Sequence, residues 1–306
     1  MNKFDIELLK KKIEEKFSFV VKQIEYLGGG VDSKAYLINN DYVFKIGISE
    51  NSKIDYKNQK VFSDFYKENN INNIEIPNIE FYHNDDNIRM VGYKIVEGTF
   101  INRNIYNSMN VVEQESFCKD VASFLKRLHD FSIDKIDLEK IDMREKMLKE
   151  VELIKKTIYN SLSENEKKYI DRFKERLIRS NVFNDKKCIC HIDFNPDHIL
   201  IDKNNKFKGV IDWGGAAIVC EYAEFPYLLS DGEDELGRDI GLKILEYYGD
   251  IDLDKTIEYC NIHRMEYPIT ELVYGIENNI NKKIEFGKKI ILKKCESDED
   301  IKKIMK

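Results

Sequence analysis

The chain has 306 residues, of which 42% are hydrophobic, and its formal net charge is -7. This length allows one or two domains with a sizeable core, and the negative charge argues against nucleic acid as a partner. No apolar run is long enough to cross a bilayer, and the first five residues lack the apolar core of a secretion signal. We therefore expect a cytoplasmic monomer that binds neither nucleic acid nor a membrane.

The first third of the chain has the periodicity of a small sheet with flanking helices. The predicted elements are a helix at 5–17, three strands within 24–48, a helix at 53–68 and two strands at 76–82 and 88–96. Glu97-Gly98 follows as a natural hinge. Helices are predicted at 111–129, within 143–179 and after 236, and short strands at 187–191, 199–201 and 208–211. This order predicts an α+β protein with two lobes, residues 1–97 and 98–306.

A glycine-rich segment, residues 27–33, lies between the first two predicted strands. Glycines let a backbone approach phosphates closely, and a serine adds a hydroxyl contact, although the same composition is common in plain hairpin turns. The candidate phosphate contacts are Gly28, Gly29, Gly30 and Ser33. Lys45 follows an apolar run in the third strand, where a kinase lysine would pair with phosphates, but lysines in strands are commonly solvated.

The segment His191-Ile-Asp-Phe-Asn-Pro-Asp-His198, followed by Ile211-Asp-Trp-Gly214, has the grouping that phosphoryl transfer needs. Asp193 can face an acceptor hydroxyl as the catalytic residue, while His198 and Asp212 can hold the divalent ion that bridges nucleotide phosphates. We expect His191 to brace this loop rather than react. The alternative is a surface hairpin with scattered acids, but the order of glycine loop, lysine and acidic loops along the chain favours a kinase.

Six cysteines are spread over the chain without the spacing of a metal-binding framework. Cys188 and Cys190 alternate on a predicted strand. This favours packing residues with free thiols over a zinc pair.

Over essentially its whole length the chain resembles the aminoglycoside phosphotransferases, and among them the 2''-phosphotransferases. One mark of that group is a histidine at position 198, where most kinases of this superfamily have asparagine. The other matching segments are Tyr42-Val-Phe-Lys45, Ile76-Pro-Asn-Ile-Glu80, Gly92-Tyr-Lys94, Glu97-Gly-Thr-Phe100, Ala122-Ser-Phe-Leu125, Lys187-Cys-Ile-Cys-His191, the loops at Asp193 and Asp212, and Val273-Tyr-Gly-Ile276.

This resemblance implies a protein-kinase-like fold, Mg²⁺ as cofactor, and transfer of the γ-phosphoryl group of GTP or ATP to the 2''-hydroxyl of an aminoglycoside, which confers antibiotic resistance. The nucleotide would lie between the lobes, near Lys45, Gln59, Tyr93, Lys94 and Val96. Aminoglycosides are polycations, so acidic residues should bind the acceptor, although acids also cluster in solvated first turns of helices. The acceptor candidates are Asp197, Glu221, Glu224, Asp231, Glu233, Asp234 and Glu235.

Four positions depart from the family pattern. Gln59 replaces the helix glutamate that usually pairs with the strand lysine, and an amide can hydrogen-bond Lys45 without offsetting its charge. Gly215, Cys220 and Ser230 replace acids, which weakens the attraction for a polycation.

Two questions stay open from the sequence. A bulky Tyr93 beside the base would block the deep adenine pose and favour guanine, or it would simply pack between the lobes. The function has two alternatives, namely a related kinase whose acceptor is not an aminoglycoside and a nucleotide-binding protein with degraded activity.

Overall fold

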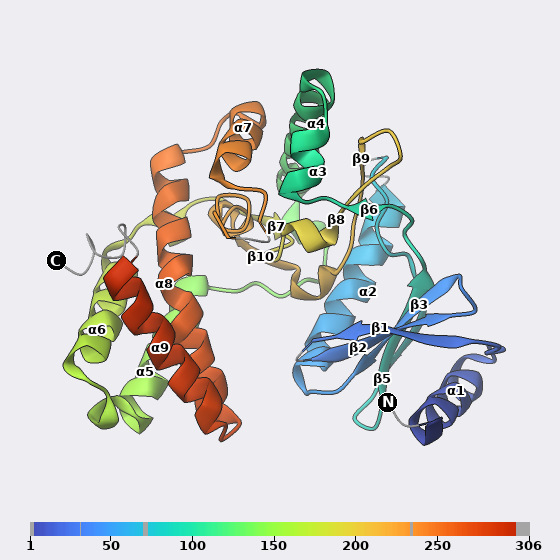
Figure 1. Ribbon diagram of the computed structural model, residues 1–306, viewed down its shortest axis with the longest axis horizontal. Coiled ribbons are helices and arrows are strands. Elements are labelled where there is room, and N and C mark those ends of the chain that lie inside the picture. The colour runs from blue at the N-terminus through green and yellow to red at the C-terminus, as the bar shows by residue number, and fades with distance from the viewer. Residues whose placement is uncertain (1–2, 31, 70–72, 233–234, 298–306) are drawn as a thin grey trace.

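The computed structural model describes residues 3–30, 32–69, 73–232 and 235–297 (Figure 1). An antiparallel sheet with two helices forms the N-terminal lobe, and helices dominate the C-terminal lobe, so the predicted α+β class is confirmed. Among the described residues, none of the helices combines the length and apolar character needed to cross a bilayer.

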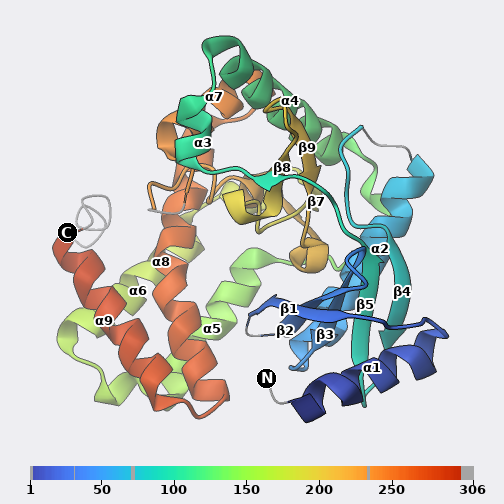
Figure 2. The ribbon, with the colours of Figure 1, turned by 45° about the vertical axis from the view of Figure 1, so that its right-hand side comes forward.

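The N-terminal sheet has five antiparallel strands in the order β1-β2-β3-β5-β4. Adjacent residues of β3 point to opposite faces, so Phe44 packs with Ile13 of α1, while Val43 packs with Tyr56 of α2. The two helices therefore cover the two faces, and Figure 2 shows α2 running along the sheet. The elements are α1 (Lys3–Phe17), β1 (Ile24–Gly29), β2 (Ser33–Ile38), β3 (Tyr42–Gly47), α2 (Asn51–Asn69), β4 (Ile79–Asn84) and β5 (Arg89–Lys94).

The C-terminal lobe carries two small sheets among its helices, β6-β8-β9 and β7-β10. The strands predicted at 199–201 and 208–211 are confirmed as β8 and β9, which pair antiparallel, whereas β6, β10 and α3 were not predicted. The elements are β6 (Thr99–Phe100), α3 (Arg103–Ser108), α4 (Val111–Asp130), α5 (Met143–Thr157), α6 (Glu164–Arg179), β7 (Lys187–Cys190), β8 (Ile199–Ile201), β9 (Phe207–Val210), β10 (Ala217–Cys220), α7 (Arg238–Tyr248), α8 (Leu253–Glu277) and α9 (Asn281–Ser297).

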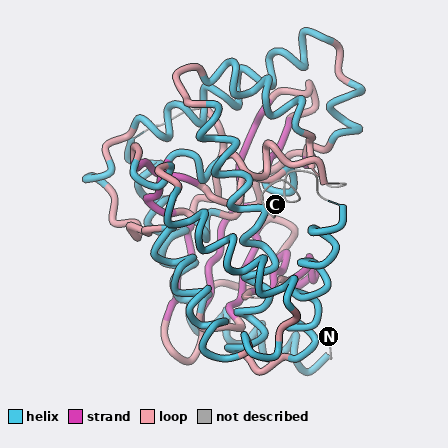
Figure 3. The backbone as a smooth tube through the Cα atoms, turned by 90° about the vertical axis from the view of Figure 1, so that its left-hand side faces the viewer, coloured by secondary structure: helices cyan, strands magenta, loops and turns pink. Residues whose placement is uncertain are grey.

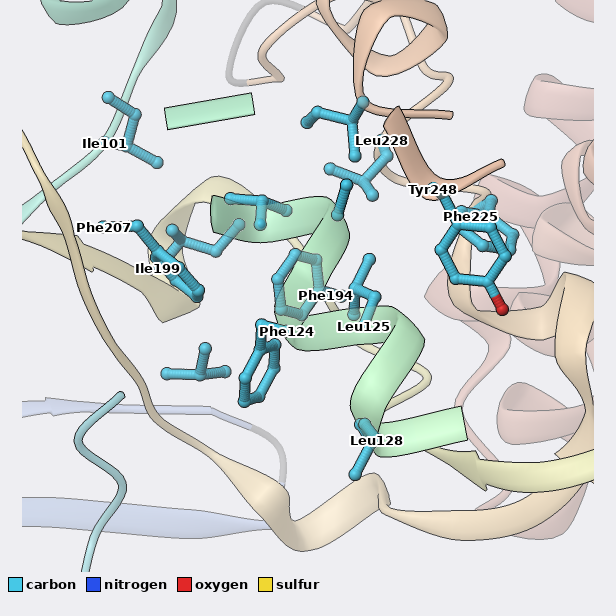
Figure 4. Close-up of a cluster of buried hydrophobic side chains, with 14 of the residues drawn as sticks. Ile101, Phe124, Leu125, Leu128, Phe194, Ile199, Phe207, Phe225, Leu228 and Tyr248 are labelled. Atoms are coloured by element: carbon cyan, nitrogen blue, oxygen red, sulfur yellow. The ribbon is translucent and has the colours of Figure 1, made fainter. Parts of the chain in front are cut away.

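Two buried clusters hold this lobe together. One surrounds α4, where Phe124 and Leu125 meet Phe194 and Phe207 from the loops and strands that follow β7 (Figure 4). The other joins α5, α6, α8 and α9, which form the helical bundle facing the viewer in Figure 3. The loops between β7 and β10 are flanked by residues of the first cluster, so the packed core fixes their position.

Helix α2 also links the two lobes. Phe62 stacks on Trp213 with ring centroids 3.8 Å apart and planes at 13°, and the Asn58 amide donates to the carbonyl of Gly214, at 3.3 Å. The rings of Phe62 and Trp213 are both buried. The helix that covers the N-terminal sheet is thus packed directly on the loop after Asp212.

Candidate active site

Asp193 lies on the loop after β7, and its side chain is 45% exposed. The Asn195 amide donates to Asp193 Oδ1, at 2.9 Å, and Asp193 is near enough to the Tyr227 hydroxyl to raise its pKa, after the larger effect of burial. Ile192, just before it, has φ of 72°, a conformation that costs a β-branched residue about 1–3 kcal/mol. The loop therefore stores strain while it presents an oriented carboxylate to solvent.

His191 is fully buried and ties two loops together. Its backbone N–H donates to Glu224 Oε2 at 2.8 Å, and its ring Nε2–H donates to the carbonyl of Ile211 at 2.9 Å. Burial lowers the pKa of His191, although Glu224 opposes the shift, which favours the neutral ring. This arrangement is consistent with a bracing role, because His191 lies two residues before Asp193 and its acceptor Ile211 directly precedes Asp212.

Asp212 faces both a cation and an imidazole. Its backbone is left-handed, with φ 65° and ψ 56°; its Oδ1 lies 2.7 Å from Lys45 Nζ, and its Oδ2 lies 3.8 Å from His198 Nε2. Burial raises the pKa of Asp212, but the Lys45 ammonium, joined by His198 when that ring is protonated, outweighs the effect and holds the pKa below its usual value. The carboxylate is therefore ionised at neutral pH.

The donor set around His198 fits a divalent cation. Its Nδ1 lies 2.8 Å from the carbonyl oxygen of Asp193, and a carbonyl can only accept, so Nδ1 carries the proton. Nε2 is then left with a lone pair on the side of Asp212. An imidazole nitrogen is a softer partner for magnesium than oxygen, but the neighbouring carboxylates supply the hard ligands.

The partner of Lys45 differs from the expectation. Lys45 forms an ion pair with Asp212 and not a contact with Gln59. Gln59 is buried against the loop that follows Asp212. A Cβ added at Gly214 would lie 3.1 Å from both Gln59 Nε2 and Asp55 Cβ, so one face of α2 packs closely on this loop.

Asp55 is a carboxylate that the sequence analysis missed. It lies one helical turn before Gln59, and this i to i+4 spacing was the signal that could have found it. Burial raises the pKa of Asp55 to about 6, Asp32 and Asp212 add to the rise, and Lys45 opposes it. Asp55 therefore belongs to the electrostatic environment of Lys45.

The glycine-rich segment forms the turn between β1 and β2. The N–H of Gly30 donates to the carbonyl of Ser33, at 3.0 Å. A Cβ at Gly29 would come within 3.0 Å of the Tyr26 hydroxyl and 3.1 Å of the Ser33 carbonyl, whereas Gly28 and Gly30 face open space. The turn thus leaves two glycines accessible beside Ser33, and phosphate binding by this turn stays a prediction.

Tyr93 is buried in the N-terminal lobe, whereas the hinge residues after it line a cavity. Tyr93 is 5% exposed and packs with Tyr56 and Val91 between the sheet and α2. Lys94 and Val96 line a cavity of about 460 Å³ that α2 also borders. Tyr93 therefore has a packing role, and a contact between any of these residues and a base stays a prediction.

Two of the acceptor candidates lie in surroundings that do not favour contact with an acceptor. Glu224 is fully buried. Its carboxylate accepts the backbone N–H of His191 and lies 3.3 Å from His129 Nε2, so a dissolved acceptor cannot reach it. Glu221 follows β10 at Cys220, which pairs with Lys187 at the start of β7. It therefore lies at the opposite end of this strand pair from Asp193.

The remaining acidic candidates are dispersed. Asp197 is exposed in the turn at Pro196–His198, and Asp231 accepts the backbone N–H of Arg238 at 2.9 Å. Glu235 contributes to the field around the Tyr227 hydroxyl, as Asp193 does. Glu233 and Asp234 lie outside the described residues.

Three further residues, far from Asp193 in sequence, form its surroundings. Tyr227 contacts the His263 ring, with centroids 5.5 Å apart. Burial lowers the pKa of His263, while Glu266 and Asp193 oppose that shift. Glu266 in turn accepts from Lys146 at 3.1 Å, beside a cavity of about 690 Å³ between α5 and α8. No local motif marks these residues.

A family model described as "Phosphotransferase enzyme family" matches residues 23–259. The chain belongs to this phosphotransferase family. It is an enzyme family, and the match spans both lobes, from β1 to the first half of α8.

Solved structures with the same fold include two aminoglycoside enzymes and one macrolide enzyme. The gentamicin complex of APH(2'')-IIa is 23% identical with a TM-score of 0.79, covering 95% of this chain and 96% of that chain. The GDP and kanamycin complex of APH(2'')-IIIa is 21% identical with a TM-score of 0.79, covering 95% and 99%. A macrolide 2'-phosphotransferase type I is 16% identical with a TM-score of 0.69, covering 95% and 98%. These likenesses confirm the expected two-lobed fold.

Proposed function

We propose that this enzyme transfers the γ-phosphoryl group of GTP or ATP to an aminoglycoside hydroxyl, the 2''-hydroxyl, and so confers resistance. The observation that carries the proposal is the set of distances around Asp212, with Lys45 at 2.7 Å, His198 at 3.8 Å, and Asp193 held by the same histidine. Support for the acceptor comes from the similar solved structures, which hold gentamicin or kanamycin, one of them with GDP.

In this proposal each side chain has a role that follows from its position. Asp193 orients the acceptor hydroxyl and takes its proton late, because a loose transition state needs little base strength. Asn195 holds the carboxylate in place, the Tyr227 hydroxyl lies close to it, and positioning of this kind carries much of the rate. Lys45 and the turn at Gly28–Gly30 hold the phosphates between residues 1–97 and 98–306. Mg²⁺ held by His198 and Asp212 would neutralise phosphate charge.

A related kinase with a different acceptor is the second candidate, and the charges around the acceptor side favour it. Lys146 lies 2.9 Å from Glu150 and 3.1 Å from Glu266, so part of the negative charge near Tyr227 is already neutralised. Glu224 is buried, and Glu221 lies at the opposite end of the β7–β10 pair from Asp193. The macrolide enzyme among the similar structures carries this fold with another class of acceptor in its name.

The test is nucleoside diphosphate release with Mg²⁺ and either GTP or ATP, in the presence of gentamicin, kanamycin, tobramycin or amikacin. We expect drug-dependent release by the wild type, at least about 10²-fold less release by Asp193→Asn, and unchanged release by Asp250→Asn, an exposed residue in the turn after α7. Mass and NMR analysis of the product would locate the phosphate. Release that ignores every drug but disappears in Asp193→Asn would favour the second candidate, and no release with any drug would contradict the aminoglycoside proposal.

A further inference from the structure

A second group of chemically reactive side chains lies in the interior of the C-terminal lobe. Cys188 and Cys190 occupy alternate positions of β7, so both point to the same face of the strand. Their sulfurs are 3.5 Å apart, and Cys190 Sγ lies 3.9 Å from Nε2 of His129, at the end of α4. All three residues are buried, and their ligand atoms lie within 4.8 Å of one another.

Glu224 places a carboxylate beside the same histidine. Its Oε2 lies 3.3 Å from His129 Nε2, and its Oε1 is buried without a hydrogen-bond partner. Leaving a carboxylate oxygen buried and unsatisfied costs several kcal/mol in general, so such an atom calls for a cation or a donor. A bound cation would satisfy this oxygen.

The spacing of the two thiols and the imidazole suits a soft cation. Zinc binds sulfur at about 2.3 Å and nitrogen at about 2.0–2.1 Å, which places neighbouring ligand atoms about 3.3–3.8 Å apart. The two sulfurs are 3.5 Å apart and Cys190 Sγ lies 3.9 Å from His129 Nε2, close to that range. A ligand set of two thiols and an imidazole also suits zinc better than magnesium.

The second ring nitrogen of His129 orients the first. Its Nδ1 lies 2.9 Å from the Tyr248 hydroxyl, which can accept the Nδ1 proton and leave the Nε2 lone pair free for a metal.

We propose that His129, Cys188 and Cys190 form a buried zinc site, with the Glu224 carboxylate beside its histidine. On binding, both thiols lose their protons and the ion replaces those protons as the partner of the sulfurs. The site is separate from the candidate magnesium ligands, but Glu224 also accepts the N–H of His191, two residues before Asp193. A bound ion would thus fix β7 and the start of the catalytic loop. This inference does not depend on the identity of the acceptor.

The first test is the zinc content of the full chain, produced in zinc-supplemented medium, desalted and measured by elemental mass spectrometry. We expect about one zinc per chain in the wild type and an at least tenfold lower content in Cys188→Ser, because a serine hydroxyl is a far weaker zinc ligand than a thiolate. Cys118→Ser is the matched control, since Cys118 is also fully buried but pairs with Tyr106; it should keep its zinc. Equal zinc content in Cys188→Ser and the wild type would overturn the proposal.

The second test needs no variant and so holds even if Cys188→Ser fails to fold. Wild-type chain produced with Co²⁺ in place of zinc should show thiolate-to-cobalt charge-transfer absorption and the intense visible bands of a tetrahedral site. Wild-type chain that retains neither zinc nor cobalt, or a cobalt spectrum without thiolate absorption, would mean that the cluster is only a buried His129–Glu224 pair with two free thiols. That result would also overturn the proposal.

Discussion

Replacing Asp55 by asparagine tests the electrostatics around Lys45 directly. Asp55 is partly buried on α2, and burial, reinforced by Asp32 and Asp212 and opposed by Lys45, raises its pKa to about 6. The folded protein therefore binds this proton more tightly than the unfolded chain does. The stability that the protonated group contributes is fully present below about pH 4 and is lost as the pH rises through about 6.

The size of this effect follows from the shift. A rise of about two pKa units corresponds to about 3 kcal/mol, and partial contact with solvent reduces this to about 1–2 kcal/mol. Asparagine keeps the shape of Asp55 but cannot ionise. We therefore expect Asp55→Asn to be more stable than the wild type by about 1–2 kcal/mol at pH 7, with only a small difference at pH 4.

Urea unfolding with EDTA and without nucleotide would measure the difference, followed by the fluorescence of Trp213, the single tryptophan and a buried one. Asp64→Asn is the matched control, because Asp64 is a half-exposed residue on the same helix; its effect should stay within about 0.5 kcal/mol at every pH. The reasoning is refuted if Asp55→Asn is less stable than the wild type at pH 7. That result would mean that attraction to Lys45 exceeds the cost of burying the charge.

Three further predictions concern packing, the base and the catalytic loop. Phe62→Ala should lower the free energy of unfolding by about 3–5 kcal/mol, because it removes a buried ring stacked on Trp213; a loss below 1 kcal/mol in urea titrations would contradict this. Tyr93→Ala should shift the ratio of turnover with GTP and ATP towards ATP if the ring blocks adenine, and an unchanged ratio would leave only the packing role. Tyr227→Phe should lower kcat about three- to tenfold without changing the KM for nucleotide, because it removes a hydroxyl that lies close to the Asp193 carboxylate; a changed KM with unchanged kcat would contradict the positioning role.

Much of the fold was readable from periodicity because its elements bury one face. Helix α4 buries Phe117, Val121 and Leu125 along one face, and that helical spacing located it. The strand β10 was missed for the opposite reason. All four of its residues, Ala217–Cys220, are buried, so the segment shows no alternation, and its pairing with β7 is a long-range contact.

The residues nearest the chemistry were predictable because turns expose them. Asp193 and Asp212 each follow a short predicted strand, and the structure brings both beside His198. Glu224 was misjudged because an acid in a first helical turn is normally solvated. Only the folded chain reveals that His129, 95 residues earlier, lies against it, since contacts of that length depend on packing that no local pattern encodes.

Helix α2 explains why stability and catalysis should respond together in this protein. On one face of α2, Asp55 and Gln59 pack against Gly214, and Phe62 stacks on Trp213. Gly214 and Trp213 both belong to the loop that begins at Asp212. The Lys45 ammonium reaches the same loop from the sheet that α2 covers. Any change that moves α2 relative to this loop must therefore either lengthen the contact between Lys45 and Asp212 or expose the stacked rings, so unfolding free energies and turnover measured on the same α2 variants should change in parallel.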